Sequence, residues 1–262
     1  MRLCDYHVHS RHSFDAKCTV TDMAAAAQRA RLAEICFTDH LEFEYEPWNV
    51  PFDPYALRAE VEAARPHTPV TLLWGAEIGL APDPAPARQA WELIRAAQPD
   101  FIIGSVHVVG DSNVYKAPYF EGKTREAAYC RYFETILASL KTLPQLSVLG
   151  HWDFVAKGAP YDPKTPCRSD APDVLDAIFR YLAENGKGME INTGVWRGGT
   201  SWGLDALKRF AQLGGQFVTF GSDAHQPGRV GERLAEAREL ALAAGIRYTA
   251  RFRQLQPTFE RL

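Results

Sequence analysis

Side chains that bind metal ions recur at the ends of the strand-like runs of this sequence. His7 and His9 form a His-x-His pair at the end of the first run, and Asp223 and His225 form a similar pair at the end of the last. Side chains two apart on a strand point to the same side, so both members of a pair can reach one metal ion. Residues of the same types end the runs in between: His40, Glu77, His107 and His151.

The elements that must position these residues alternate along the whole chain. Apolar, β-branched runs predict strands at residues 3–9, 34–40, 70–78, 101–109, 147–154, 188–193 and 217–225. Amphipathic segments predict helices at residues 21–31, 55–65, 86–96, 125–143, 172–185, 204–213 and 229–244. Thr21 is expected to cap the first helix, and Ser169 or Asp170 the sixth.

Seven strand–helix repeats without a break in composition predict one domain over residues 1–262, a parallel sheet curled into an α/β barrel. A doubly wound open sheet is the alternative. In a barrel, the carboxyl ends of all strands open on one face, where the active sites of such barrels lie. Six of the seven expected strands bring His, Asp or Glu to that face, whereas His67 falls on the opposite rim. The joint placement predicts a metal cluster.

The overall composition is that of an ordinary water-exposed globular protein. Of 262 residues, 46% are hydrophobic and 23% charged, and the net charge of −3 offers no basic field for nucleic acid or an anionic membrane. No apolar stretch is long enough to span a membrane or to form a signal segment, so a cytoplasmic location is expected. The five cysteines contain no CxxC pair, which argues against disulfides or a thiolate zinc site. No feature of the sequence indicates an oligomeric state.

The ordered series of motifs resembles the polymerase and histidinol phosphatase (PHP) superfamily. The motifs that carry the resemblance are His7-Val8-His9-Ser10, Thr38-Asp39-His40, Glu77, Ser105-Val106-His107, Gly150-His151 and Ser222-Asp223-Ala224-His225. They run across nearly the whole chain. The resemblance implies a distorted (β/α)7 barrel of the TIM type with three divalent metal ions. Within the superfamily, the chain is most similar to the histidinol-phosphate phosphatases, which carry a lid-bearing insertion like residues 108–146.

The resemblance also implies how the ligands are shared out. One metal would be held by His7, His9, Glu77 and Asp223, and a second by Glu77, His107 and His151. A third would take His40, His225 and a residue of the loop after His9, for which Asp15 and His12 compete. Mixed imidazole and carboxylate ligands suit Zn, Mn or Fe, so the choice among these metals stays open.

The implied activity is hydrolysis of a small phosphate monoester, L-histidinol phosphate above all, by attack of a metal-bridging hydroxide. Closely spaced divalent ions lower the pKa of a bridging water and leave a net positive centre for a dianionic substrate. Catalytic roles are thereby implied for Glu77 and Asp223. The resemblance assigns phosphate binding to Arg197, whose guanidinium could grip two phosphoryl oxygens. Asp39 and His12 are candidates for a general acid or for orienting the ligands.

Histidinol carries an amine and an imidazole, which an acidic and aromatic rim would suit. The segment after His40 supplies such groups, with Glu42 as the main candidate, and Trp152 is a further one. Tyr115 and Lys116, inside the long insertion, are candidates for a lid over the substrate. Two rival interpretations remain: a related enzyme for another small ester such as a nucleotide or sugar phosphate, and a barrel that binds metal without catalysis.

Overall fold

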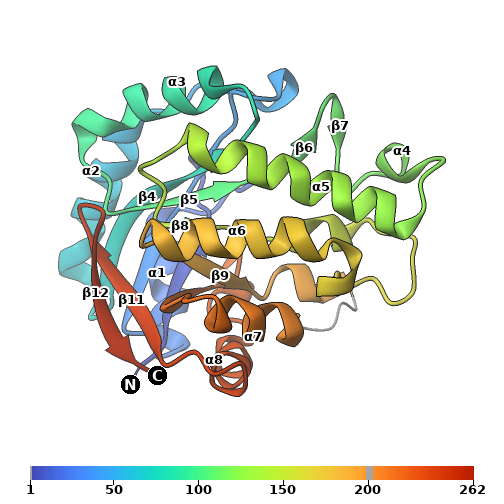
Figure 1. The fold of residues 1–262 in the computed structure, drawn as a ribbon. Coiled ribbons are helices and arrows are strands. Elements are labelled where there is room, and N and C mark those ends of the chain that lie inside the picture. The colour runs from blue at the N-terminus through green and yellow to red at the C-terminus, as the bar shows by residue number, and fades with distance from the viewer. Residues whose placement is uncertain (1, 199–202) are drawn as a thin grey trace.

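The computed structural model describes residues 2–198 and 203–262 and is built around seven parallel strands (Figure 1). In chain order these strands are β1 (Cys4–Val8), β2 (Glu34–Phe37), β4 (Thr71–Gly79), β5 (Phe101–Ser105), β8 (Val148–Leu149), β9 (Gly188–Asn192) and β10 (Phe217–Gly221). Each pairs in parallel with the next. The short β3 (His40–Leu41) continues the direction of β2 and pairs with β4.

The first and last of these strands meet through an isolated parallel bridge between Val8 and Ala224. The amide of His9 donates to the carbonyl of Ala224 at 2.9 Å, and β10 packs along β1. A short bridge in place of a full ladder makes this a distorted barrel, as the resemblance implied. The open doubly wound alternative is wrong, because its two outer strands would not touch.

Seven long helices follow the parallel strands and cover the outside of the barrel (Figure 1). They are α1 (Val20–Arg29), α2 (Pro54–Ala64), α3 (Pro84–Ile94), α5 (Arg125–Ser139), α6 (Pro172–Glu184), α7 (Leu204–Gln212) and α8 (Leu234–Ala243), with the short α4 (Ala117–Phe120). Single 3₁₀ turns are η1 (Glu46–Trp48), η2 (Arg65–His67), η3 (Arg95–Ala97), η4 (Leu140–Thr142), η5 (Phe154–Lys157), η6 (Arg168–Asp170), η7 (Val195–Gly198) and η8 (Pro227–Arg229).

Two expected helix caps are wrong. Helix α1 is capped by Thr19, whose side chain accepts from the amide of Asp22 in a capping box, so Thr21 lies inside the helix. Helix α6 follows Ala171, which makes no side-chain cap, and begins on Pro172. The carboxylate of Asp170 instead accepts from Arg125 and from the amide of Cys167, and the proline at the first position of the helix has no amide proton to satisfy.

Most expected strands end before their last metal-binding residue: β1 stops at Val8 and β5 at Ser105. The run at 34–40 is split into β2 and β3, β8 is only two residues long, and β10 stops at Gly221. Asp223 then adopts a left-handed backbone with φ of 55°. These turns bring the polar side chains together at one spot, which straight strands would not do.

The segment between β5 and β8 forms the expected insertion. It holds the hairpin of β6 (Val108–Val109) and β7 (Ser112–Asn113), then α4 and α5, and it projects beyond the carboxyl ends of the strands (Figure 1). The insertion therefore lies at the end of the barrel where the metal-binding residues gather.

A C-terminal hairpin, which the sequence analysis did not anticipate, closes the opposite end. Strand β11 (Tyr248–Arg253) pairs with the start of β10, and β12 (Gln256–Arg261) pairs antiparallel with β11. The ring of Phe252 packs 4.9 Å from Phe101 and 6.1 Å from Tyr6, inside a buried cluster of barrel residues. This apolar plug fills the barrel interior, so the polar site is confined to the other end.

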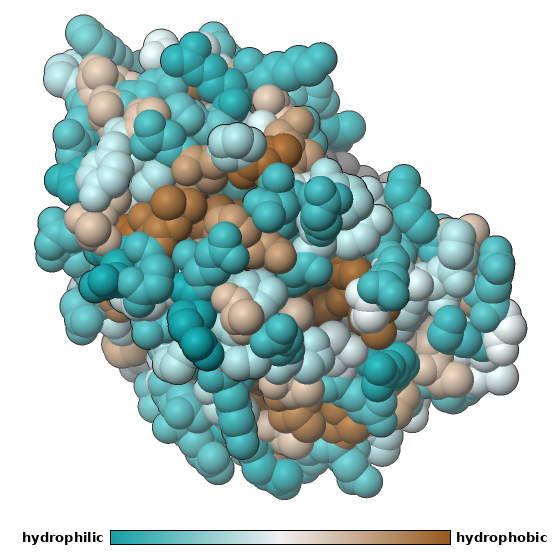
Figure 2. Space-filling model, turned by 90° about the horizontal axis from the view of Figure 1, so that it is seen from above, coloured by the Kyte–Doolittle hydropathy of each residue, from teal (hydrophilic) through white to brown (hydrophobic). Residues whose placement is uncertain are grey.

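Hydrophilic side chains cover most of the face seen from above, and hydrophobic residues appear there as separate patches between them (Figure 2). Among the residues that the structure describes, no helix is both long and apolar enough to cross a membrane.

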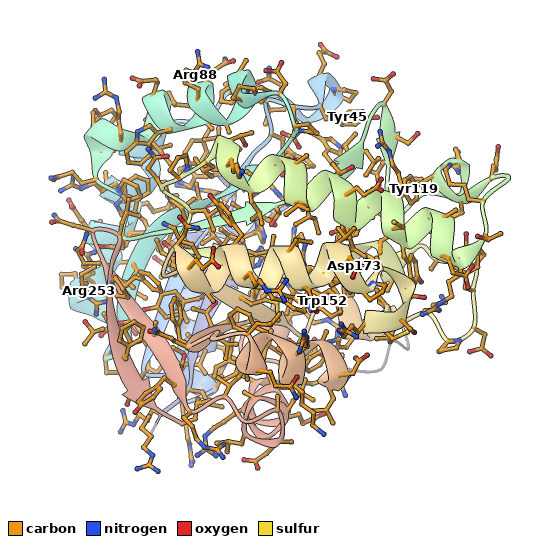
Figure 3. The ribbon with its side chains drawn as sticks, viewed as in Figure 1. Tyr45, Arg88, Tyr119, Trp152, Asp173 and Arg253 are labelled. Atoms are coloured by element: carbon orange, nitrogen blue, oxygen red, sulfur yellow. The ribbon has the colours of Figure 1, made fainter. Side chains whose placement is uncertain are left out.

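An ion pair between the buried Glu34 and the half-exposed Arg253 links the barrel to the hairpin and gives a test of the fold. Glu34 is fully buried and accepts hydrogen bonds from Tyr6 and from Arg253, which lies on the hairpin (Figure 3). We expect Arg253→Leu to lower the free energy of unfolding by about 2 kcal/mol, because it leaves a buried carboxylate short of its cation. Urea denaturation measures this loss.

The neighbouring Arg251 is the matched control, because its partner Glu260 is about a third exposed. Arg251→Leu should cost less than about 1 kcal/mol. Equal losses of unfolding free energy in the two variants would show that the Glu34–Arg253 pair does not anchor the hairpin.

Candidate metal centre

All nine residues predicted as metal ligands converge at the carboxyl ends of the parallel strands. Potential ligand atoms lie within 4.8 Å of one another in three groups of these residues. The groups are His7, His9 and Asp223; Glu77, His107 and His151; and His9, Asp15, His40 and His225. Groups of this composition and spacing can hold metal ions.

Glu77 lies at the centre of the cluster and is fully buried. One carboxylate oxygen, Oε2, lies 3.1 Å from Nε2 of His7, and the other, Oε1, lies 2.8 Å from Nε2 of His151. His40 is its partner in the β3–β4 ladder. Burial alone would raise the pKa of Glu77, but the nearby histidines hold it well below its ordinary value. Glu77 is thus an anion facing two groups of imidazoles, which is the geometry of a bridging ligand.

Asp223 faces the His7–His9 pair from the turn after the neighbouring strand β10. Its Oδ1 lies 3.3 Å from Nε2 of His9 and 3.7 Å from Nε2 of His7. Its left-handed backbone is held by the preceding residue, Ser222, whose amide donates to the buried carboxylate of Asp5 at 2.9 Å. The turn after β10, and not strand alternation, therefore aims Asp223 into the cluster.

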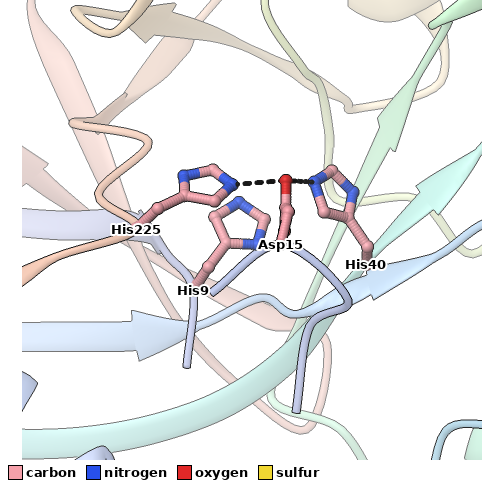
Figure 4. A group of neighbouring side chains, drawn as sticks. All are labelled: His9, Asp15, His40 and His225. Carbon is pink, nitrogen blue, oxygen red and sulfur yellow. Dashed lines mark hydrogen bonds and ion pairs between the residues drawn. The ribbon is translucent and has the colours of Figure 1, made fainter. Parts of the chain in front are cut away.

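The third group surrounds Asp15 (Figure 4). Oδ2 of Asp15 lies 3.0 Å from Nε2 of His225 and 3.7 Å from Nε2 of His40. The ring of His9 stacks between these two histidines, at 4.1 Å from His225 and 4.5 Å from His40. His12, the competing candidate, lies outside the group, with its Nε2 2.9 Å from Glu60 of α2.

Buried carboxylates orient the histidines from behind. Glu42 was expected on an acidic rim facing substrate, but that placement is wrong: it is 2% exposed and does not line the cavity. Its Oε1 lies 2.8 Å from Nδ1 of His40 and 3.0 Å from Nδ1 of His107. A carboxylate at Nδ1 fixes the tautomer and leaves Nε2 free to bind metal.

Glu190 orients His7 of the first strand in the same way, a role that was not predicted from the sequence. It lies on β9, with Oε1 2.7 Å from Nδ1 of His7 and Oε2 accepting from the amide of His151 at 2.8 Å. A Cβ at Gly221 would meet Glu190 Oε1 at 2.0 Å, so the glycine on β10 makes room for this carboxylate. The signal in the sequence was a charged residue in the middle of an otherwise buried strand.

The other predicted site residues fall in different places. Asp39 is buried and accepts from the amide and hydroxyl of Ser10, at 2.6 and 2.8 Å, so it holds the turn after His9. Trp152 stacks on Phe133 of α5 at 5.8 Å, on the helical side of the barrel (Figure 3), away from the cavity lining. The side chain of Arg197 lies outside the described part of the structure.

A small cavity of about 80 Å³ opens over the cluster. Tyr115 lines it as expected, and Lys116 lies against the ring of Tyr115, its Nζ 4.7 Å from the ring centre. Trp48, from the aromatic segment expected after His40, also lines the cavity, and three further lining residues were not predicted: Phe14, Phe154 and Lys157. A larger cavity of about 510 Å³ lies beside β11 and β12, but no His, Asp or Glu lines it, so the chemistry belongs to the small one.

The donor set suits divalent metal ions. Burial, together with the nearby His225 and His40, lowers the pKa of His9 to about 3, so this imidazole is neutral, which is the form that binds metal. Its Nε2 is buried without a hydrogen-bond partner and faces Asp223. An uncompensated buried nitrogen is costly, and a bound cation would satisfy it.

The fold and the cluster define a metal-dependent α/β barrel of the hydrolase type, with its ligands at the carboxyl ends of the strands. The PHP domain model matches residues 5–194, and the chain belongs to this family.

Full-length relatives agree with the family. A histidinol-phosphatase of Lactococcus lactis is 30% identical over 96% of this chain and 95% of its own length. A probable histidinol-phosphatase of Deinococcus radiodurans is 30% identical over 97% of this chain and 99% of its own. The crystal structure of the Lactococcus lactis histidinol phosphate phosphatase, complexed with zinc, L-histidinol and phosphate, superposes with a TM-score of 0.89 at 29% identity, over 98% of this chain and 99% of that one.

The contacts of Glu42 predict its effect on metal binding. Glu42→Gln removes the negative charge that pairs with Nδ1 of His40 and lies 3.0 Å from Nδ1 of His107, so we expect metal affinity to fall roughly 10- to 100-fold. Metal content after dialysis against buffered zinc measures the change. Glu46→Gln, on the exposed part of the same loop, should leave metal content unchanged, and equal affinity in the two variants would contradict the orienting role.

The charge state of His225 predicts a pH effect in the metal-free protein. Burial would lower the pKa of His225, but the hydrogen bond to Asp15 and the charge of Asp223 raise it to about 9. The protonated imidazole stabilises the metal-free fold below the unfolded-state pKa of about 6.5, and that contribution is lost as the pH rises through about 9. A metal ion requires the neutral form, so binding must displace this proton.

We therefore expect zinc binding to release at least one proton at pH 7, and apparent affinity to rise as pH increases towards 9. Titration calorimetry in two buffers with different heats of ionisation counts the protons. An affinity that did not change between pH 7 and 9 would contradict the assignment.

Proposed function

We propose that this protein is a phosphoric monoester hydrolase that converts L-histidinol phosphate to L-histidinol and phosphate, in a metal-dependent reaction of histidine biosynthesis. The observation that carries the proposal is the Glu77 carboxylate, whose two oxygens face separate groups of imidazoles beneath a small open cavity. The likeness to a histidinol phosphate phosphatase structure that contains zinc, L-histidinol and phosphate supports the substrate.

The three residue groups would hold three divalent ions, and zinc, the ion in the related structure, is the first candidate. Glu77 would belong to two of the sites, with His7, His9 and Asp223 on one side and His107 and His151 on the other. Asp15 would complete the third, with His40 and His225. When bound, such ions polarise phosphoryl oxygens and lower the pKa of a bound water.

The chain's own residues would bind and orient the ester. Lys157 lines the cavity, and its Nζ lies 5.1 Å from the ring centres of both Tyr115 and Phe154. The two rings support an ammonium group that can meet a dianionic phosphate. Arg197 would add a bidentate contact to the same oxygens. Glu42, Glu190 and Asp39 would keep the histidines and the turn after His9 in place.

The test measures phosphate release from L-histidinol phosphate, AMP and a sugar phosphate by protein of known metal content. The Glu77→Gln variant is assayed on the same esters. We expect kcat/KM for histidinol phosphate to exceed that for the other esters by about a hundredfold or more, which corresponds to about 3 kcal/mol of transition-state binding. Glu77→Gln should lose at least a thousandfold in kcat, together with bound metal.

A higher kcat/KM for AMP or the sugar phosphate would identify the protein as a phosphatase of another small ester. Near-full turnover by Glu77→Gln with intact metal content would contradict the shared-carboxylate scheme itself.

A further inference from the structure

Two aromatic rings stand at the mouth of the cavity and have no part in holding metal. Phe14 and Trp48 both line the cavity, and Phe14 is 39% exposed. Water-exposed apolar rings beside a polar centre are unfavourable unless something covers them. The neighbouring contacts indicate what kind of group that is.

The two rings form a continuous wall. Phe14 precedes Asp15 in the loop after β1, and Trp48 ends the η1 turn after β3. Their rings are nearly parallel, with an interplanar angle of 16° and centres 5.8 Å apart. We call this pair the Phe14–Trp48 wall. Tyr45 supports it from behind, with its ring edge-on to Trp48 at 4.9 Å.

The Phe14–Trp48 wall is fixed to the metal centre at both ends. Phe14 stacks on His40 with ring centres 5.1 Å apart and an angle of 28°, and Trp48 lies edge-on to His107 at 6.1 Å. A group that occupies the cavity above these histidines therefore lies against the wall. A phosphate ester bound over these histidines would place its leaving group within reach of the wall.

The opposite side of the cavity is also aromatic. Tyr115 and Phe154 meet edge to face at 5.6 Å, and Phe154 packs on His151 at 4.6 Å. A leaving group between the two sides meets ring faces and edges. A sugar hydroxyl placed against the ring faces of Phe14 and Trp48 would lose its hydrogen bonds to water, which is costly, whereas an aromatic ring would stack there.

We propose that the Phe14–Trp48 wall is a specificity-determining surface that selects phosphate monoesters whose leaving group carries an aromatic ring. The inference rests on the proposed phosphatase function and adds which residues of this chain recognise the leaving group. The imidazole of histidinol and the ring of an aryl phosphate share the required chemistry, and the experiment separates them.

The test compares Phe14→Leu, Trp48→Leu and the double variant on three esters: L-histidinol phosphate, p-nitrophenyl phosphate and glycerol phosphate. Leucine keeps the apolar character but removes the flat ring. We expect kcat/KM for histidinol phosphate to fall about tenfold per ring, mainly through KM, while the value for glycerol phosphate changes less than twofold. Trp48→Phe keeps a ring and should retain the preference for the aromatic ester.

Tyr55→Leu is the matched control, because this ring is 57% exposed on α2 and does not line the cavity. It should leave all three activities unchanged. Zinc content is measured in every variant, because Phe14 and Trp48 also touch histidines of the cluster. Trp48→Leu provides an independent test if Phe14→Leu folds poorly.

An unchanged ratio of histidinol phosphate to glycerol phosphate activity in the double variant would overturn the proposal. A parallel loss on all three esters with loss of zinc would also overturn it, since the rings would then only support the metal centre. Wild-type protein that hydrolysed p-nitrophenyl phosphate but not histidinol phosphate would contradict the proposed substrate. It would still agree with the selection of aromatic leaving groups by the Phe14–Trp48 wall.

Discussion

The site is organised around the fully buried carboxylate of Glu77. Removing a charge from water costs several kcal/mol unless close partners of opposite charge compensate it. Imidazoles from four other strand ends surround this anion, including His7, His107 and His151. Each of them must come from a different part of the chain, so the cluster can form only when the barrel has brought the strand ends together.

The strands of the barrel end early, and the turns that follow them bring these side chains together. β10 ends at Gly221, and the left-handed backbone of Asp223 is held by hydrogen bonds from Ser222 to Asp5. Buried acids behind the cluster fix the ring orientations: Glu42 at His40 and His107, and Glu190 at His7. The histidines of the cluster thus rest on an outer layer of buried carboxylates.

The two ends of the barrel differ in character. At one end, Phe252 of the C-terminal hairpin packs on Tyr6 and Phe101 and fills the interior. At the other end, the insertion brings Tyr115 to the cavity beside Lys157. At the hairpin end, the charged groups of Glu34 and Arg253 pair with each other, whereas His, Asp and Glu side chains of the cluster line the cavity at the other end.

The sequence by itself determined the class of fold and which His, Asp and Glu side chains gather at one end of the barrel. Strand–helix alternation and the positions of His7, Glu77 and Asp223 at strand ends follow from local periodicity, which burial imposes on every strand and helix. The family resemblance added the sharing of ligands among three sites. The fold class and the convergence of these side chains could be predicted because both depend on spacing along the chain, whereas the sharing of ligands among three sites stays a prediction.

Only the tertiary structure decided what each side chain faces. Glu42 follows a strand in an acidic, aromatic segment that looks solvated, yet folding carries it beneath two histidines. Trp152 is adjacent to a ligand in sequence but packs on the helical side, and Asp15 enters the cluster where His12 turns to Glu60. The direction of a side chain in a loop depends on contacts with residues far along the chain, and those contacts exist only once the barrel has closed.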